Sequence, residues 1–180
     1  QLLPAKNKQI TVLDSKKAKH KFKIEGAHFW DVETLSLLFQ ATTNTQQPFL
    51  RRVLSGKEKF KTTPLKRYVE KVFEKVFSTG EAKSDALDLS REIARMIDCE
   101  LLQEHLKGII YYNKDKYFKH ASGTYYNSNG NGFDANIKPI IDESVNLDGI
   151  DQFDELILRC YLQLCSDVVF GYAQYEHIQP

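Results

Sequence analysis

The stretch LKRYVEKVFEKVF, residues 65–77, contributes most to the choice of fold. Its apolar residues recur at intervals of three and four, which places them in one continuous stripe along a helix. Lys and Glu residues on the opposite side are spaced so that they can pair along the helix. Thr63 and Pro64 precede the stretch and Gly80 follows it, the usual order of a cap, a first-turn proline and a terminal glycine. The pattern predicts an amphipathic helix that packs against a core.

Further helical patterns flank this stretch on both sides. Asp31 and Ser84 are candidate N-caps, and Gly56 and Gly108 are candidate stops. The apolar period that starts after Ser84 continues as far as Leu101. The additional helices expected from these signals span residues 31–41, 46–55, 84–107 and 151–173.

The last of these helices is apolar nearly all round, which is typical of a helix at the centre of a bundle. Its polar residues form a single narrow seam, because Glu155, Arg159, Gln163 and Asp167 recur every four positions. Charged residues within the segment argue against a membrane span, since the hydrocarbon region tolerates them poorly.

Extended structure is expected in two places. Residues 9–13 and 20–25 are rich in β-formers and predict a small hairpin with one Lys-rich face. Residues 109–120 fit either two strands around a turn or a further helix, and the pattern leaves both open. Residues 122–136 are rich in Asn and Gly and predict a loop, and Pro139 argues against a helix interior just after it.

Together these patterns predict an α+β fold that is mainly α. We expect a bundle of about five or six helices around the apolar C-terminal helix, with the small β-hairpin at the N-terminus. The chain has 180 residues, which is enough for one domain with a substantial core. We therefore expect a single domain over 1–180, with a hairpin extension at 1–28 and a helical body at 29–180 that carries an irregular loop near 122–139.

The three cysteines, Cys99, Cys160 and Cys165, are an odd number in apolar surroundings, which favours reduced core thiols. A reducing compartment follows, so we expect a cytoplasmic protein. A cleaved signal upstream of Gln1 is the alternative.

The charge is distributed unevenly along the chain. Residues 1–80 hold 16 of the 25 Lys and Arg but only 7 of the 24 Asp and Glu, so the two parts of the chain carry opposite net charge. A basic surface is the usual mark of a polyanion-binding face. Within the acidic part, residues 107–126 form a basic segment that holds five of the nine tyrosines. Aromatic rings beside cations are how single-stranded nucleic acids are held, although tyrosines also line the rim of a core.

No spacing typical of a metal or cofactor site occurs, and we expect no cofactor. The string Asn127 to Gly132 resembles the start of a calcium loop, but Lys138 stands where the loop requires a bidentate Glu. Acidic residues between 142 and 155 could assemble a magnesium site, although helix capping and solvation explain them as well. His120, beside Ser122 and Thr124, is the histidine best placed to serve a catalytic site, but loop histidines are usually solvated.

The leading hypothesis is a non-catalytic binding or regulatory protein that engages an acidic partner such as a nucleic acid. One alternative is a metal-dependent hydrolase or nuclease that uses the acidic cluster 142–155. Another is a protein–protein inhibitor or a subunit of a homo-oligomer. A helix-turn-helix over residues 31–55 offers a second route to nucleic acid. The residues expected to bind the polyanion are Lys16, Lys17, Arg51, Arg52, Lys66, Arg67, Tyr111, Tyr112, Lys114, Lys116, Tyr117 and Lys119.

Overall fold

A computed structural model describes residues 26–59 and 64–170. The chain divides into two compact units between Pro48 and Phe49, and each unit is described by itself. Within the described residues the chain is mainly helical and carries a small three-stranded antiparallel sheet, which confirms the expected class. The predicted N-terminal hairpin, including Lys16 and Lys17, lies outside the described residues.

The first unit contains α1 (Gly26–Phe29) and α2 (Val32–Leu38). Asp31 caps α2 as predicted, because its carboxylate accepts hydrogen bonds from the backbone N–H of Thr34 at 2.8 Å and from the Thr34 hydroxyl at 3.0 Å. The helix ends before residue 41, and Gln40 takes a left-handed conformation just beyond it.

Helix α3 (Gln46–Lys59) runs through Gly56, so the prediction that this glycine stops the helix was wrong. A Cβ at Gly56 would lie 3.6 Å from the Tyr68 hydroxyl, a normal contact distance. The glycine therefore lies in the helix where it packs beside Tyr68, and no left-handed turn forms there.

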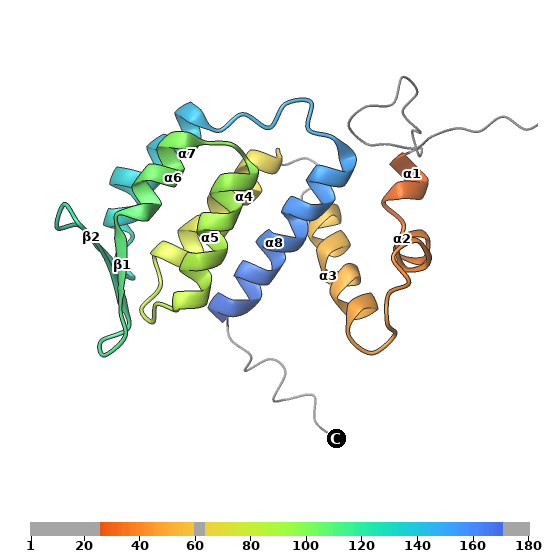
Figure 1. The fold of residues 1–180 in the computed structure, drawn as a ribbon, viewed down its shortest axis with the longest axis horizontal. Helices are drawn as coiled ribbons and strands as arrows, with labels where there is room; N and C mark the ends of the chain where they lie inside the picture. Colours follow the sequence, from red (N-terminus) through yellow and green to blue (C-terminus); the bar gives the residue numbers. More distant parts are fainter. Residues whose placement is uncertain (1–25, 60–63, 171–180) are drawn as a thin grey trace, which may run out of the picture. The chain divides into compact units, whose positions relative to one another are not determined.

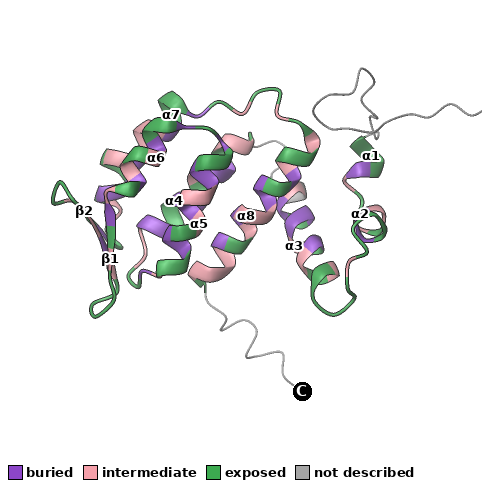
Figure 2. Cartoon of the chain, viewed as in Figure 1, coloured by how far each residue is buried: buried purple, intermediate pink, exposed green. Residues whose placement is uncertain are grey.

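Three long helices build the core of the second unit: α4 (Leu65–Phe77), α5 (Ser84–Met96) and α8 (Gln152–Phe170). Both α4 and α5 pack against α8 (Figure 1). The apolar stripe of α4 is buried as predicted, whereas α8 exposes Ile157 and Leu164 on its far side. Figure 2 shows buried residues along all three helices, with exposed and intermediate residues between them. The cysteines are free, and Cys99 and Cys165 are buried, which agrees with the expected core thiols.

The single helix predicted over 84–107 is two helices, because α5 ends at Met96 and α6 (Glu100–Lys107) begins after a break. The break is a Schellman motif, in which Asp98 takes the left-handed position with φ of 52°. The N–H of Cys99 reaches back to the carbonyl of Ala94 at 3.3 Å, and that of Asp98 to Arg95 at 3.1 Å. Both helices face the same core, which is why the apolar period continues across the break.

The predicted loop at 122–136 also contains regular structure. A π-helical turn, η2 (Phe133–Ile137), leads directly into α7 (Lys138–Ser144), with Pro139 in the first turn of α7. Helical backbone therefore runs across Pro139, but the proline occupies the first turn of α7, where its missing N–H costs little. The N–H of Lys138 bonds to the carbonyl of Phe133, five residues back, and this wider turn precedes the residue that has no N–H to donate.

The sheet resolves the ambiguity at 109–120 in favour of strands. It consists of β1 (Ile109–Tyr112), β2 (Tyr117–His120) and β3 (Tyr125–Tyr126), paired antiparallel in that order. In the register, Tyr112 lies opposite Tyr117 and Lys119 lies opposite both Ile110 and Tyr125. Figure 1 shows the sheet at one end of the second unit, beside α6.

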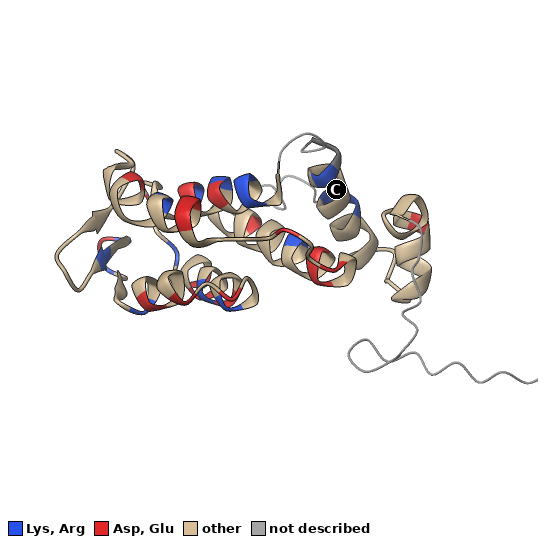
Figure 3. Cartoon of the chain, turned by 90° about the horizontal axis from the view of Figure 1, so that it is seen from above, with Lys and Arg blue, Asp and Glu red and all other residues tan. Residues whose placement is uncertain are grey.

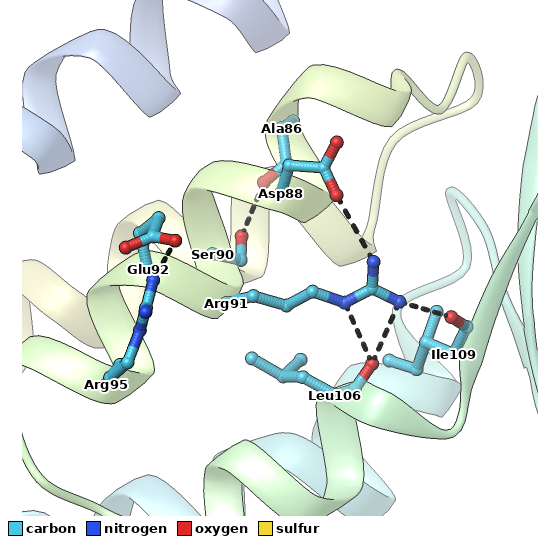
Figure 4. A network of polar contacts seen from close by, with 8 residues as sticks. All are labelled: Ala86, Asp88, Ser90, Arg91, Glu92, Arg95, Leu106 and Ile109. Atoms are coloured by element: carbon cyan, nitrogen blue, oxygen red, sulfur yellow. Dashed lines mark hydrogen bonds and ion pairs between the residues drawn. The ribbon is translucent and has the colours of Figure 1, made fainter.

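Arg91 of α5 attaches this sheet to the helices (Figure 4). Its guanidinium donates to the carbonyl of Ile109 at 2.8 Å and to that of Leu106 at 3.4 Å, while Asp88 holds the third nitrogen at 3.2 Å. Leu106 is in the last turn of α6, where carbonyls lack partners within the helix. One side chain therefore satisfies the end of α6 and the start of β1.

Of the helices in the described ranges, none combines the length and the apolar character needed to cross a membrane.

Candidate binding surface on the sheet

Strand alternation divides the sheet into two faces with different environments. The inner face carries Ile109, Phe118 and Tyr126, which are almost fully buried. Phe77, at the end of α4, lies under this face, with its ring 5.6 Å from that of Phe118 and 5.4 Å from that of Tyr126. The inner face therefore fixes the sheet on the core of the unit.

The outer face presents aromatic rings to solvent. Tyr112 and Tyr117 stack almost in parallel, with centroids 4.8 Å apart and an angle of 7° between the rings. Tyr125 continues the row, with its ring 5.5 Å from that of Tyr117. Tyr112 is 40% exposed, Tyr125 is 50% exposed, and Ile110 beside them is 52% exposed. We call Ile110, Tyr112, Tyr117, Lys119 and Tyr125 the tyrosine face.

The cation of this face is Lys119, whose ammonium lies 4.7 Å from the centre of the Tyr125 ring. A hydrogen bond with Tyr125 raises the pKa of Lys119, so its charge persists at neutral pH. Partial burial, followed by the neighbouring tyrosines, raises the pKa of Tyr117, so its hydroxyl stays neutral. The face thus combines a row of tyrosine rings with one positive charge.

The turn between β1 and β2 is held against the connection between α4 and α5. The ammonium of Lys116 bonds to Glu81 at 2.6 Å, and the carbonyl of Lys116 accepts from the N–H of Ala82 at 2.7 Å. Lys116 itself has a left-handed backbone with φ of 49°. Lys114 lies in the same turn and is exposed.

The structure brings together some of the predicted binding residues and separates others. Tyr112, Tyr117 and Lys119 share the tyrosine face. Tyr111 belongs to the inner face, where its ring lies 5.8 Å from that of Phe118. Lys114 lies at the turn, and Lys116 is held there by an acidic partner.

The remaining predicted basic residues lie on α3 and α4. Arg51 and Arg67 are exposed, Arg52 pairs with Asp167 at 2.9 Å, and Lys66 donates to the carbonyl of Asp142 at 2.5 Å. Figure 3 shows Lys and Arg interleaved with Asp and Glu on several of the described helices. Of these four residues, Arg52 is therefore balanced by an acidic side chain.

Two members of the tyrosine face, Ile110 and Tyr125, were not among the predicted residues. Ile110 could have been found from strand alternation, because it is two positions from Tyr112. Tyr125 lies in a strand of two residues within an Asn/Gly-rich segment, and its pairing with Lys119 depends on a contact that periodicity does not reveal.

The acidic segment 142–155 makes capping and ion-pair contacts. Asp151 accepts from the N–H of Phe153 at 2.9 Å, Asp142 lies 3.4 Å from Lys138, and Glu155 lies 2.8 Å from Arg159. Over the described ranges, no three His, Cys, Asp or Glu side chains gather closely enough to hold a metal ion. The hydrolase alternative thus has no ligand set in this part of the chain.

Comparison of the chain with known protein families, with curated proteins and with solved structures finds no match.

Proposed function

We propose that this protein binds single-stranded nucleic acid through the tyrosine face. The supporting observation is the row of three contiguous tyrosine rings on the solvent side of a sheet whose other side is anchored in the core. Nucleic-acid bases of any sequence can stack on exposed aromatic rings, and each stacked base contributes about 1–3 kcal/mol to the binding free energy. Tyr112 and Tyr117 stack face to face, so a base would contact the outer faces and exposed edges of the row and not the space between these two rings.

The charge on and near the face supports a binding mode dominated by stacking. Lys119 lies on the face and Lys114 lies at its turn, whereas Lys116 is neutralised by Glu81. With two phosphate contacts, the logarithm of the affinity for a single strand falls against the logarithm of salt with a slope of about −1 to −1.5. In a duplex the bases are stacked on each other and cannot stack on the tyrosine rings. We therefore expect a duplex to bind more weakly than a single strand.

Fluorescence anisotropy with labelled single-stranded RNA and DNA, and with the matching duplex, tests this proposal. Tyr117→Leu and Tyr125→Leu should each weaken single-strand binding about tenfold, because they remove a ring and keep an apolar side chain. Tyr125→Phe keeps the ring and should bind almost normally. Phe39→Leu is the control, because it removes an exposed aromatic ring from the other unit. Equal binding by all four variants, or none by the wild type at low salt, would overturn the proposal.

A further inference from the structure

A second group of polar residues lies at the end of β2, on the inner side of the sheet. The Ser122 hydroxyl lies 2.8 Å from Nδ1 of His120, and the backbone N–H of Ser122 donates to the same nitrogen at 3.1 Å. Because the amide donates to it, Nδ1 carries the lone pair and the ring proton is on Nε2. The hydroxyl proton of Ser122 therefore points at a basic nitrogen.

The imidazole of His120 is held by neighbours on two other elements. It stacks on His105 of α6, with centroids 4.5 Å apart and an angle of 6° between the rings. Nε2 of His105 lies 2.5 Å from the Tyr126 hydroxyl, which holds that ring in turn. Gly108 lies against the edge of His120, and a Cβ there would overlap Nε2. The position of His120 therefore depends on a glycine and on a second histidine.

We propose that Ser122 and His120 form a nucleophile–base pair for acyl transfer from carboxylic esters. A serine becomes nucleophilic when a base lies within hydrogen-bond distance and a third group orients that base, and here His105 is the orienting group. Ser122 and Gly123 are exposed, so an ester can approach from solvent. The hydroxyl of Thr124, 3.5 Å from Ser122 Oγ, adds a donor beside the reacting oxygen.

In the reaction, Ser122 Oγ forms a bond to the ester carbonyl carbon as its proton moves to His120 Nδ1. The carbon–oxygen bond to the alcohol then breaks, and Nδ1 returns the proton to the leaving oxygen. Water, with His120 again accepting its proton, attacks the carbonyl carbon of the acyl-serine. The bond from that carbon to Ser122 Oγ breaks, Nδ1 returns the proton to Oγ, and a carboxylic acid is released. Burial, followed by the charge of His120, lowers the pKa of His105. His105 therefore stays neutral beneath the imidazolium that forms on His120.

The test is labelling of the full chain with a fluorophosphonate probe, followed by peptide mapping. We expect the label on Ser122, and Ser122→Ala should abolish it. Ser128→Ala removes another exposed serine of the same segment and should leave the labelling rate unchanged. His120→Asn keeps an acceptor for the Ser122 amide but provides no base, so labelling should slow at least tenfold.

Gly108→Ala provides a test that leaves both members of the pair intact. The added methyl group displaces the His120 ring, so labelling should slow while circular dichroism and the melting temperature show a folded protein. Labelling spread over several serines, or a wild-type rate in His120→Asn, would overturn the proposal. Neither result bears on nucleic-acid binding, because the pair lies on the opposite side of the sheet from the tyrosine face.

Discussion

Successive residues along β2 and along β3 have different roles, because their side chains point to opposite faces of the sheet. Phe118 is fully buried, whereas Tyr125, one position before the buried Tyr126, is half exposed. Phe118→Ala should lower the free energy of unfolding by about 3–5 kcal/mol, since it leaves a cavity beside Phe77. Tyr125→Ala should cost less than about 1 kcal/mol. Urea denaturation measures both, and an equally large loss in Tyr125→Ala would mean that the tyrosine face is part of the core.

His105 makes the stability of the fold depend on pH. The pKa of His105 is lowered in the folded protein, mainly by burial and then by His120. A lowered histidine pKa means that the unfolded chain binds the proton more readily. Stability from this group is therefore complete above the unfolded pKa of about 6.5 and is lost as the pH falls below it.

Thermal unfolding between pH 8 and pH 5 measures this effect. The melting temperature of the wild type should fall more steeply below pH 6.5 than that of His105→Gln, in which the amide keeps a hydrogen-bonding group near Tyr126. Parallel curves for the two proteins would contradict the prediction, because the carboxylates and the other histidines are common to both.

At the scale of elements, helices with local signals were predicted and breaks set by backbone conformation were not. The apolar stripe of 65–77 predicted α4 because its period acts within a few positions, whereas Pro64 is the N-cap and not the first helical residue as expected. The boundary between α5 and α6 has no glycine, since Asp98 takes the left-handed position that glycine usually fills. The residues of the proposed tyrosine face show the same division. Tyr112, Tyr117 and Lys119 were found by composition, but their faces could not be assigned until residues 109–120 were known to be strands.

The left-handed position of Asp98 gives a prediction for the break. A left-handed residue with a Cβ costs about 1–2 kcal/mol, and Asp tolerates this conformation better than most. Asp98→Ala should therefore lower the free energy of unfolding by about 1 kcal/mol, and Asp98→Gly should keep or raise it. Chemical denaturation compares the two, and equal stabilities would show that the Schellman motif is not strained.

The contacts of Arg91 give a prediction for the junction of α6 and β1. Arg91→Met keeps most of the side-chain volume but leaves the carbonyls of Leu106 and Ile109 without their donor. The side chain is 38% exposed, so water replaces part of the loss and we expect a cost of about 1–2 kcal/mol. Relative to the wild type, Arg91→Met should accelerate amide hydrogen exchange more in β1 than in α4. Uniform acceleration across the unit would contradict a local role.

At the scale of the whole molecule, the oppositely charged parts of the chain meet within the second unit. Arg52 pairs with Asp167, and Lys57 lies 3.5 Å from Glu155. Glu70 pairs with Lys138, and here the acidic residue comes from the basic part of the chain and the basic residue from the acidic part. These contacts pair charges within one molecule that could otherwise pair with a second copy of the chain.

Raising the salt concentration should therefore lower the stability of the fold slightly, without changing the molecular mass of the protein in solution. Partly exposed pairs contribute up to about 1 kcal/mol each and are screened by ions. Raising NaCl from 50 to 500 mM should lower the melting temperature slightly, and less so in Asp167→Asn, which has already lost the pair with Arg52. Light scattering should give one mass throughout. A molecular mass that halves in high salt would instead show that the protein assembles through charged contacts between molecules.

The alternation of the sheet has a consequence for how this protein can change over evolutionary time. Positions 110, 112, 117, 119 and 125 face solvent, and their neighbours at 109, 118 and 126 hold the strands on the core. Substitutions at the first set carry little penalty for folding, so selection can alter the chemistry of this surface while the scaffold persists. The tyrosine face can thus vary by single substitutions without loss of the fold.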